Sequence, residues 1–123
     1  MTDEASFKRE LVRQCRQRGW YARRHEDRFA VGALDLAILV RGFPQTLYAE
    51  GKVVPHQAFA PTPRQYEEGR RYIAAGGLCA LIGWDPSTKQ MFVSEWAQEA
   101  KKASSFTAEG DYAEVLEAWL RGH

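Results

Sequence analysis

The chain has 123 residues, a length that fits one domain, and its 45% hydrophobic and 27% charged residues predict a packed core and exclude intrinsic disorder. The formal net charge is +1, but residues 1–75 carry 13 Lys/Arg against 9 Asp/Glu, whereas residues 76–123 carry 4 against 7. This asymmetry fits a polyanion partner and an unevenly charged surface equally well. No apolar run approaches the ~20 residues that span a bilayer, and the N-terminus has no apolar secretory segment, so we expect a cytoplasmic protein without a membrane partner.

The first predicted element is a helix over residues 6–18. Phe7, Leu11 and Cys15 recur at the spacing i, i+4, i+8, which indicates one face turned toward a core. The other cysteine, Cys79, lies far away in the chain, and neither cysteine has the spacing of a zinc site. We therefore expect both cysteines to act as small buried hydrophobic residues.

The next segment is predicted to be largely extended. Residues 20–29 are ambiguous between strand and loop. Two strands are expected over 34–40 and 46–54, joined by the breaker-rich turn 41–45. The first of them is nearly all apolar, which is typical of a strand covered on both faces.

A second helix is expected over residues 62–75. Thr62 is its predicted N-cap, Pro63 takes the favoured first position, and Gln65 completes a capping box. The remaining predicted elements, in chain order, are strands over 78–84 and 89–94, a helix over 95–103, and a last helix from residue 111.

A second capping box, formed by Asp111 and Glu114, is predicted to start the last helix. The order of helix, strands, helix, strands and helices predicts an α/β or α+β sandwich with a mixed central sheet. We expect one domain over residues 1–123, with a core over about 6–94 and a C-terminal helical extension over about 95–123.

Three charged residues, Asp35, Glu50 and Lys52, interrupt the apolar hairpin. Glu50 and Lys52 are two apart and share a strand face, while Asp35 comes from the partner strand. Two carboxylates about 4 Å apart repel by roughly 4 kcal/mol at an effective dielectric of 20, so a divalent cation would stabilise them. Carboxylates and water are the ligands that Mg²⁺ or Mn²⁺ prefers, and such an ion activates water toward a phosphodiester. The alternative is a surface ion pair between Glu50 and Lys52.

Asp35 followed by Glu50-Gly51-Lys52 on the next strand resembles the PD-(D/E)XK nuclease superfamily. The resemblance is greatest to the VRR-NUC domains and the archaeal Holliday junction resolvases. It spans about residues 9–77 and includes RELVRQCRQRGW, GALDLAILV, TLYAEGK and PTPRQYEEGRRYIAAGG. It implies a restriction-endonuclease-like core with a mixed central sheet flanked by helices. Leu34 stands where the superfamily has proline.

The resemblance also implies a role for each matching residue. Asp35 and Glu50 would bind Mg²⁺ or Mn²⁺ directly, and the Gly51 carbonyl would complete the metal's ligand shell. Lys52 would be the catalytic lysine. Two further residues would assist: Glu10 would help to bind the metal or its waters, and Gln65 would lie near the site.

Simpler interpretations remain open for the two assisting residues. A glutamate on a basic amphipathic helix, such as Glu10, is commonly solvated or paired with a neighbour, here Arg13 or Gln14. The capping box explains Gln65 without any chemistry.

Four residues are candidates for contacts with nucleic acid: Arg64, Arg70, Arg71 and His56. Guanidinium groups in this position would follow a phosphate backbone, although each arginine alone also fits a solvated helix face. His56 follows Lys52 in a loop, where it would either touch phosphate or lie on the surface.

The function predicted from these residues is a Mg²⁺- or Mn²⁺-dependent endonuclease that acts on DNA, with branched or flapped DNA as the candidate substrate in phage or bacterial recombination or repair. Cutting a junction requires two symmetric cleavages, so a homodimer is expected. The alternative is an inactive module on the same fold that binds nucleic acid or protein.

Overall fold

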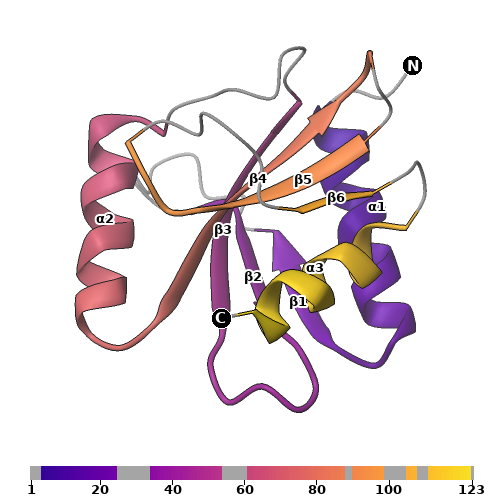
Figure 1. Ribbon diagram of the computed structural model, residues 1–123, viewed down its shortest axis with the longest axis horizontal. Coiled ribbons are helices and arrows are strands. Elements are labelled where there is room, and N and C mark those ends of the chain that lie inside the picture. The colour runs from indigo at the N-terminus through magenta and orange to yellow at the C-terminus, as the bar shows by residue number, and fades with distance from the viewer. Residues whose placement is uncertain are drawn as a thin grey trace.

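The computed structural model describes residues 4–24, 34–53, 61–87, 90–98, 105–107 and 111–122, with the backbone alone for 105–107. The elements in chain order are α1 (Glu4–Gln17), β1 (Tyr21–Arg24), β2 (Leu36–Leu39), β3 (Leu47–Val53), α2 (Pro63–Ala74), β4 (Leu78–Asp85), β5 (Gln90–Glu95), β6 (Ser105–Thr107) and α3 (Tyr112–Arg121). The strands form one sheet in the order β1 to β6, in which β3 and β4 are parallel and every other pair is antiparallel. Helix α2 covers one face, and α1 and α3 cover the other (Figure 1). The predicted mixed sheet flanked by helices is confirmed.

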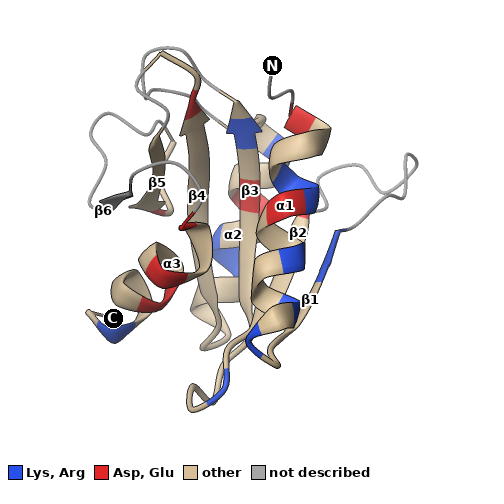
Figure 2. Cartoon of the chain, turned by 90° about the vertical axis from the view of Figure 1, so that its right-hand side faces the viewer, with Lys and Arg blue, Asp and Glu red and all other residues tan. Residues whose placement is uncertain are grey.

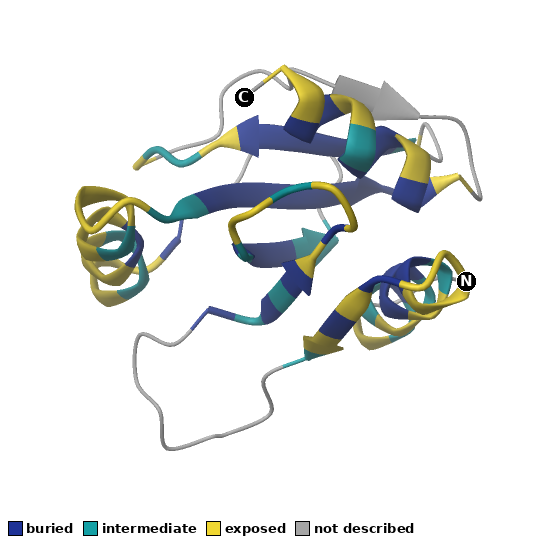
Figure 3. Cartoon of the chain, turned by 90° about the horizontal axis from the view of Figure 1, so that it is seen from below, coloured by how far each residue is buried: buried dark blue, intermediate teal, exposed yellow. Residues whose placement is uncertain are grey.

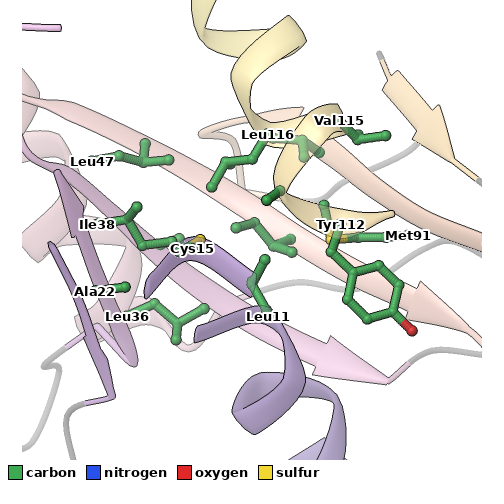
Figure 4. Packing of buried hydrophobic residues seen from close by; sticks show 14 of the residues in the cluster. Leu11, Cys15, Ala22, Leu36, Ile38, Leu47, Met91, Tyr112, Val115 and Leu116 are labelled. Carbon is green, nitrogen blue, oxygen red and sulfur yellow. The ribbon is translucent and has the colours of Figure 1, made fainter. Parts of the chain in front are cut away.

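Helix α1 buries the stripe that its sequence predicts. Phe7, Leu11 and Cys15 have no exposed surface. Figure 4 shows Leu11 pointing into a cluster that also contains Leu36 of β2 and Leu116 of α3. The apolar face of α1 is therefore the main contact between the first helix, the sheet and the last helix.

Strand β2 is buried on one face only, which corrects the expectation that both faces are covered. Leu36 and Ile38 have no exposed surface, whereas Leu39 is 39% exposed. Figure 3, which views the structure from below, shows buried and exposed positions on this strand. Within the described residues, α2 makes its main contact with the sheet at β4, at the middle of the sheet, which leaves this face of β2 less covered.

Helix α2 begins as predicted. The Thr62 hydroxyl accepts a hydrogen bond from the Gln65 backbone N–H at 3.2 Å, and the Gln65 side-chain oxygen accepts one from the Thr62 N–H at 2.9 Å. At the middle of the helix, a Cβ on Gly69 would lie 2.3 Å from Cε2 of Trp96. Glycine at this position therefore lets the indole ring pack against the helix backbone.

The predicted helix over 95–103 is wrong in the part that the structure describes. Glu95 ends β5, and residues 96–98 are not helical. The Trp96 indole N–H donates to the Tyr66 carbonyl at 3.1 Å, which ties the chain to α2 and turns it away from the sheet's end. Strand β6 then adds an edge to the sheet, so the C-terminal extension is not purely helical.

The start of α3 also differs from its prediction. Asp111 is the N-cap residue, but its side chain makes no capping hydrogen bond. The side-chain oxygen of Gln14, on α1, accepts hydrogen bonds from the N–H groups of Tyr112 at 2.8 Å and Ala113 at 3.1 Å. A residue almost a hundred positions away therefore caps this helix, and α3 packs into the core cluster through Leu116.

We predict that Gln14→Ala lowers the free energy of unfolding by about 1–2 kcal/mol, because two N–H groups at the α3 terminus lose their acceptor. Urea denaturation followed by far-UV circular dichroism measures this change. Gln17→Ala, at an exposed position on the same helix, is the matched control and should change stability by less than about 0.5 kcal/mol. Equal stability of the two variants would show that the long-range cap contributes nothing.

Candidate active site

Asp35 and Glu50 lie opposite each other on neighbouring strands. Asp35 directly precedes β2, and Glu50 is in the second half of β3. Leu36 is the register partner of Ala49 in the antiparallel β2–β3 pair, which places the preceding Asp35 opposite Glu50. The Asp35 carboxylate accepts a hydrogen bond from the backbone N–H of Gly51 at 3.2 Å. The structure therefore brings together the two acids and the glycine that were predicted to form the metal site.

Glu50 is a buried carboxyl group with incomplete hydrogen bonding. Glu50 is only 3% exposed, and its Oε2 accepts a hydrogen bond from Gln65 Nε2 at 2.9 Å. Its Oε1 is buried and has no hydrogen-bond partner among the described residues. Burial raises the pKa of Glu50 to about 8, and the charge of Asp35 and hydrogen bonding with it add to this rise. The Lys8 charge and the Gln65 hydrogen bond act in the opposite direction.

Lys8, on α1, is a part of this site that sequence reasoning missed. Its ammonium group forms an ion pair with Asp35, and a longer one of 3.5 Å with Glu4. A Cβ on Gly51 would lie 3.3 Å from Lys8 Cε, so the glycine leaves room for the lysine stem. One signal was available in the sequence: Lys8 precedes Val12 by one helical turn, and Val12 is buried at the edge of the α1 stripe.

Glu10 lies on a different side of α1 from Lys8, because positions i and i+2 of a helix are separated by about 200° around its axis. Its carboxylate accepts hydrogen bonds from Arg13 Nε at 2.7 Å and from Gln14 Nε2 at 3.1 Å. The Arg13 hydrogen bond is the main cause that lowers the pKa of Glu10. The pairing left open from the sequence is therefore present, and Glu10 makes no contact with Asp35 among the described residues. A role for Glu10 at a metal stays a prediction.

Lys52 shares the β3 face of Glu50 and is half-buried. Within the described parts of the chain, its ammonium group makes no hydrogen bond or ion pair. The alternative of a surface pair with Glu50 is wrong, because Glu50 is buried and bonds to Gln65 instead. Gln65 caps α2 through its backbone N–H and side-chain oxygen, and its Nε2 also donates to Glu50. A catalytic role for Gln65 stays a prediction.

The predicted nucleic-acid contacts on α2 are exposed side chains, namely Arg64, Arg70 and Arg71. Arg64 directly precedes Gln65 at the site end of the helix. The Arg70 guanidinium lies 5.9 Å from the Tyr66 ring centre and donates to its hydroxyl at 3.3 Å. His56 lies outside the described residues, and contacts from all four residues to nucleic acid stay predictions.

The oxygen atoms at this site fit a divalent cation. Glu50 Oε1 is buried without a partner in the described parts of the chain, so this oxygen could accept a cation as a ligand. Mg²⁺ is commonly held by one or two protein carboxylates, with water at its other positions. No group of three or more His, Cys, Asp or Glu that could hold a metal is found among the described residues, and Asp35 and Glu50 are the two carboxyl groups that lie together here. Lys8 would compete with the ion for Asp35.

We predict that, in EDTA, Glu50→Gln makes the protein more stable than the wild type at about pH 8.5 but not at about pH 4.5. The folded wild type favours the neutral Glu50 carboxyl up to about pH 8, whereas the unfolded chain ionises it near the ordinary value of 4.5. Wild-type stability therefore falls as the pH rises between these values. The expected gain for the variant exceeds about 1 kcal/mol, or several degrees in Tm.

Thermal unfolding at both pH values measures this difference. Glu67→Gln, at an exposed position on α2, is the matched control and should follow the wild type at each pH. A Glu50→Gln protein that is no more stable than the wild type at the higher pH would contradict the raised pKa of Glu50.

The fold is similar to that of a solved structure of Hjc, a Holliday junction resolvase from the archaeal hyperthermophile Archaeoglobus fulgidus. The TM-score is 0.57, the match covers 72% of each chain, and 15% of the residues are identical. No family model matches the chain, and no curated protein does. The structural match confirms the predicted restriction-endonuclease-like α/β fold, in which a mixed sheet is flanked by helices.

Proposed function

We propose that this protein is a metal-dependent nuclease that hydrolyses phosphodiester bonds of DNA. The observation that carries the proposal is the buried Glu50 carboxyl, whose unpartnered oxygen lies at a site shared with Asp35. A carboxyl group buried in this way is costly unless a cation or another ligand binds it. The shared fold with a Holliday junction resolvase supports the same activity.

Asp35 and Glu50 would hold Mg²⁺ or Mn²⁺, which polarises a phosphoryl oxygen and lowers the pKa of water. The Gly51 N–H orients the Asp35 carboxylate, and Gln65 fixes one oxygen of Glu50 so that the other stays available. Lys52, on the same strand face as Glu50, would donate hydrogen bonds to the attacking water and to the charge that develops on the phosphate.

For the substrate, we propose branched or flapped DNA, in a recombination or repair process in the cytoplasm. Symmetric cutting of a junction needs two active sites, so we propose a homodimer in which each copy cuts one strand. The described part of the chain contains no helix that is long and apolar enough to cross a bilayer.

One observation favours a second candidate, a binding module on the same fold that no longer cuts. Lys8 already supplies a positive charge to Asp35, in the place where a catalytic cation would supply one. If Lys8 replaces the ion permanently, the site holds its acids together without any catalysis. Metal binding therefore separates the two candidates.

In a cleavage assay on supercoiled plasmid and a labelled four-way junction, we expect cutting in Mg²⁺ or Mn²⁺ and none in EDTA. Glu50→Gln and Lys52→Met should each reduce the rate by at least about 100-fold, because both groups act on the reacting phosphate or its metal. Glu67→Gln serves as the control and should cut at the wild-type rate. Full activity in Lys52→Met would remove Lys52 from the mechanism, and metal-independent cutting would overturn the proposal.

We predict that Lys8→Met binds Mn²⁺ about tenfold more tightly than the wild type, because the ion no longer has to displace an ammonium group from Asp35. Isothermal titration calorimetry measures both affinities without any cleavage. Arg9→Gln removes one positive charge from the neighbouring exposed position and controls for bulk charge. Absence of Mn²⁺ binding in both the wild type and Lys8→Met would favour the binding module.

A further inference from the structure

A groove of about 1130 Å³ lies along the outer side of α1 and against β1. Five arginines line it: Arg9, Arg13 and Arg16 from α1, and Arg23 and Arg24 from β1. Figure 2 shows basic positions on both elements on the same side of the molecule. This arginine groove is separate from the exposed arginines of α2, which lie across the sheet.

The arginines of α1 repeat with the spacing of one helix face. Arg9, Arg13 and Arg16 stand at i, i+4 and i+7, so they form a row about 10 Å long. One DNA strand advances about 3.4 Å along the duplex axis for each phosphate, so the length of this row corresponds to about three steps along one strand, or four successive phosphates. The spacing therefore suits a polymer with a regular series of negative charges.

Some of these guanidinium groups are held in place by the protein. Arg16 Nε donates to the Ala22 carbonyl at 3.0 Å, and Arg24 Nη1 donates to the Ala5 carbonyl at 3.2 Å. Arg13 is paired with Glu10 at 2.5 Å. The Arg16 and Arg24 contacts join α1 to β1, and the Arg13–Glu10 pair lies along α1, so these three side chains are oriented before any ligand binds.

The other two arginines keep their hydrogen-bonding capacity. Arg9 and Arg23 are exposed, and neither makes a hydrogen bond or ion pair within the described residues. Among the described residues that line the groove there are five arginines and one acidic side chain, Glu10. A free guanidinium presents a planar fork of donors that matches a phosphate group.

We propose that the arginine groove binds the phosphodiester backbone of a nucleic acid. A lipid surface fits less well, because the lining offers charged side chains but no row of large apolar residues to insert. Arg24 is the register partner of Leu36, which directly follows Asp35, so one end of the groove lies beside the candidate active site. Binding of nucleic acid in the groove does not depend on the proposed function. Guidance of a bound strand from the groove to the candidate active site does depend on it.

Fluorescence anisotropy with a labelled DNA duplex, in EDTA so that no cleavage occurs, tests the groove. The double variant Arg9→Gln/Arg23→Gln should bind about tenfold more weakly than the wild type at about 0.1 M salt, and the slope of log K against log salt should be less steep by about 1.8. Arg41→Gln/Arg121→Gln, which removes two exposed arginines elsewhere, is the matched control and should bind within twofold of the wild type. Thermal unfolding checks that all three proteins are folded.

Equal loss of affinity in both double variants would overturn the proposal, because it would reflect net charge alone. Wild-type affinity in the groove variant, or binding to phosphatidylserine vesicles without binding to DNA, would also overturn it. The wild type could bind DNA and yet cut none with Mg²⁺ or Mn²⁺, while the groove variant loses the binding. That combination would support the groove and refute the proposed nuclease. The two proposals therefore fail separately.

Discussion

The parallel pairing of β3 with β4 is the constraint on which the candidate site depends. These strands are the one parallel pair in the described sheet, and their register runs from Leu47↔Leu78 to Val53↔Trp84. Parallel neighbours cannot be joined by a tight turn, so the chain must cross over the sheet between them. Helix α2 lies in that crossover, and its first turn carries Gln65 to the Glu50 carboxyl. The connection that completes the sheet therefore also builds one side of the site.

The site is held by groups that each offset part of an electrostatic cost. Burying Glu50 beside Asp35 disfavours the ionised form of Glu50, which is why its pKa lies well above the ordinary value. Gln65, the Gly51 N–H and Lys8 compensate in part from three different elements. A divalent cation would compensate more fully, but it would have to share Asp35 with Lys8. The position of Lys8 would therefore decide how strongly the proposed site binds a metal.

Helix α1 serves several purposes because its sides face different surroundings. The stripe around Leu11 fills the core, and Lys8 reaches the acidic site. Gln14 reaches α3 and caps it, while the row from Arg9 to Arg16 lines the arginine groove. Successive residues turn by about 100°, so one short helix supplies the core, the site, the cap and the groove at the same time.

The sequence by itself determined the features that depend on neighbouring residues: the α1 stripe, the β2–β3 hairpin and the capping box of Thr62 and Gln65. The hairpin also predicted that Asp35 and Glu50 come together, whereas only the resemblance to the nuclease superfamily implied that Gln65 lies near them. Only the tertiary structure decided that Lys8 and not Glu10 faces Asp35, that Gln14 caps α3, and that β6 joins the sheet. These contacts either join residues far apart in the chain or depend on how a helix is rotated against the sheet. Local sequence patterns specify neither the long-range pairing nor the rotation.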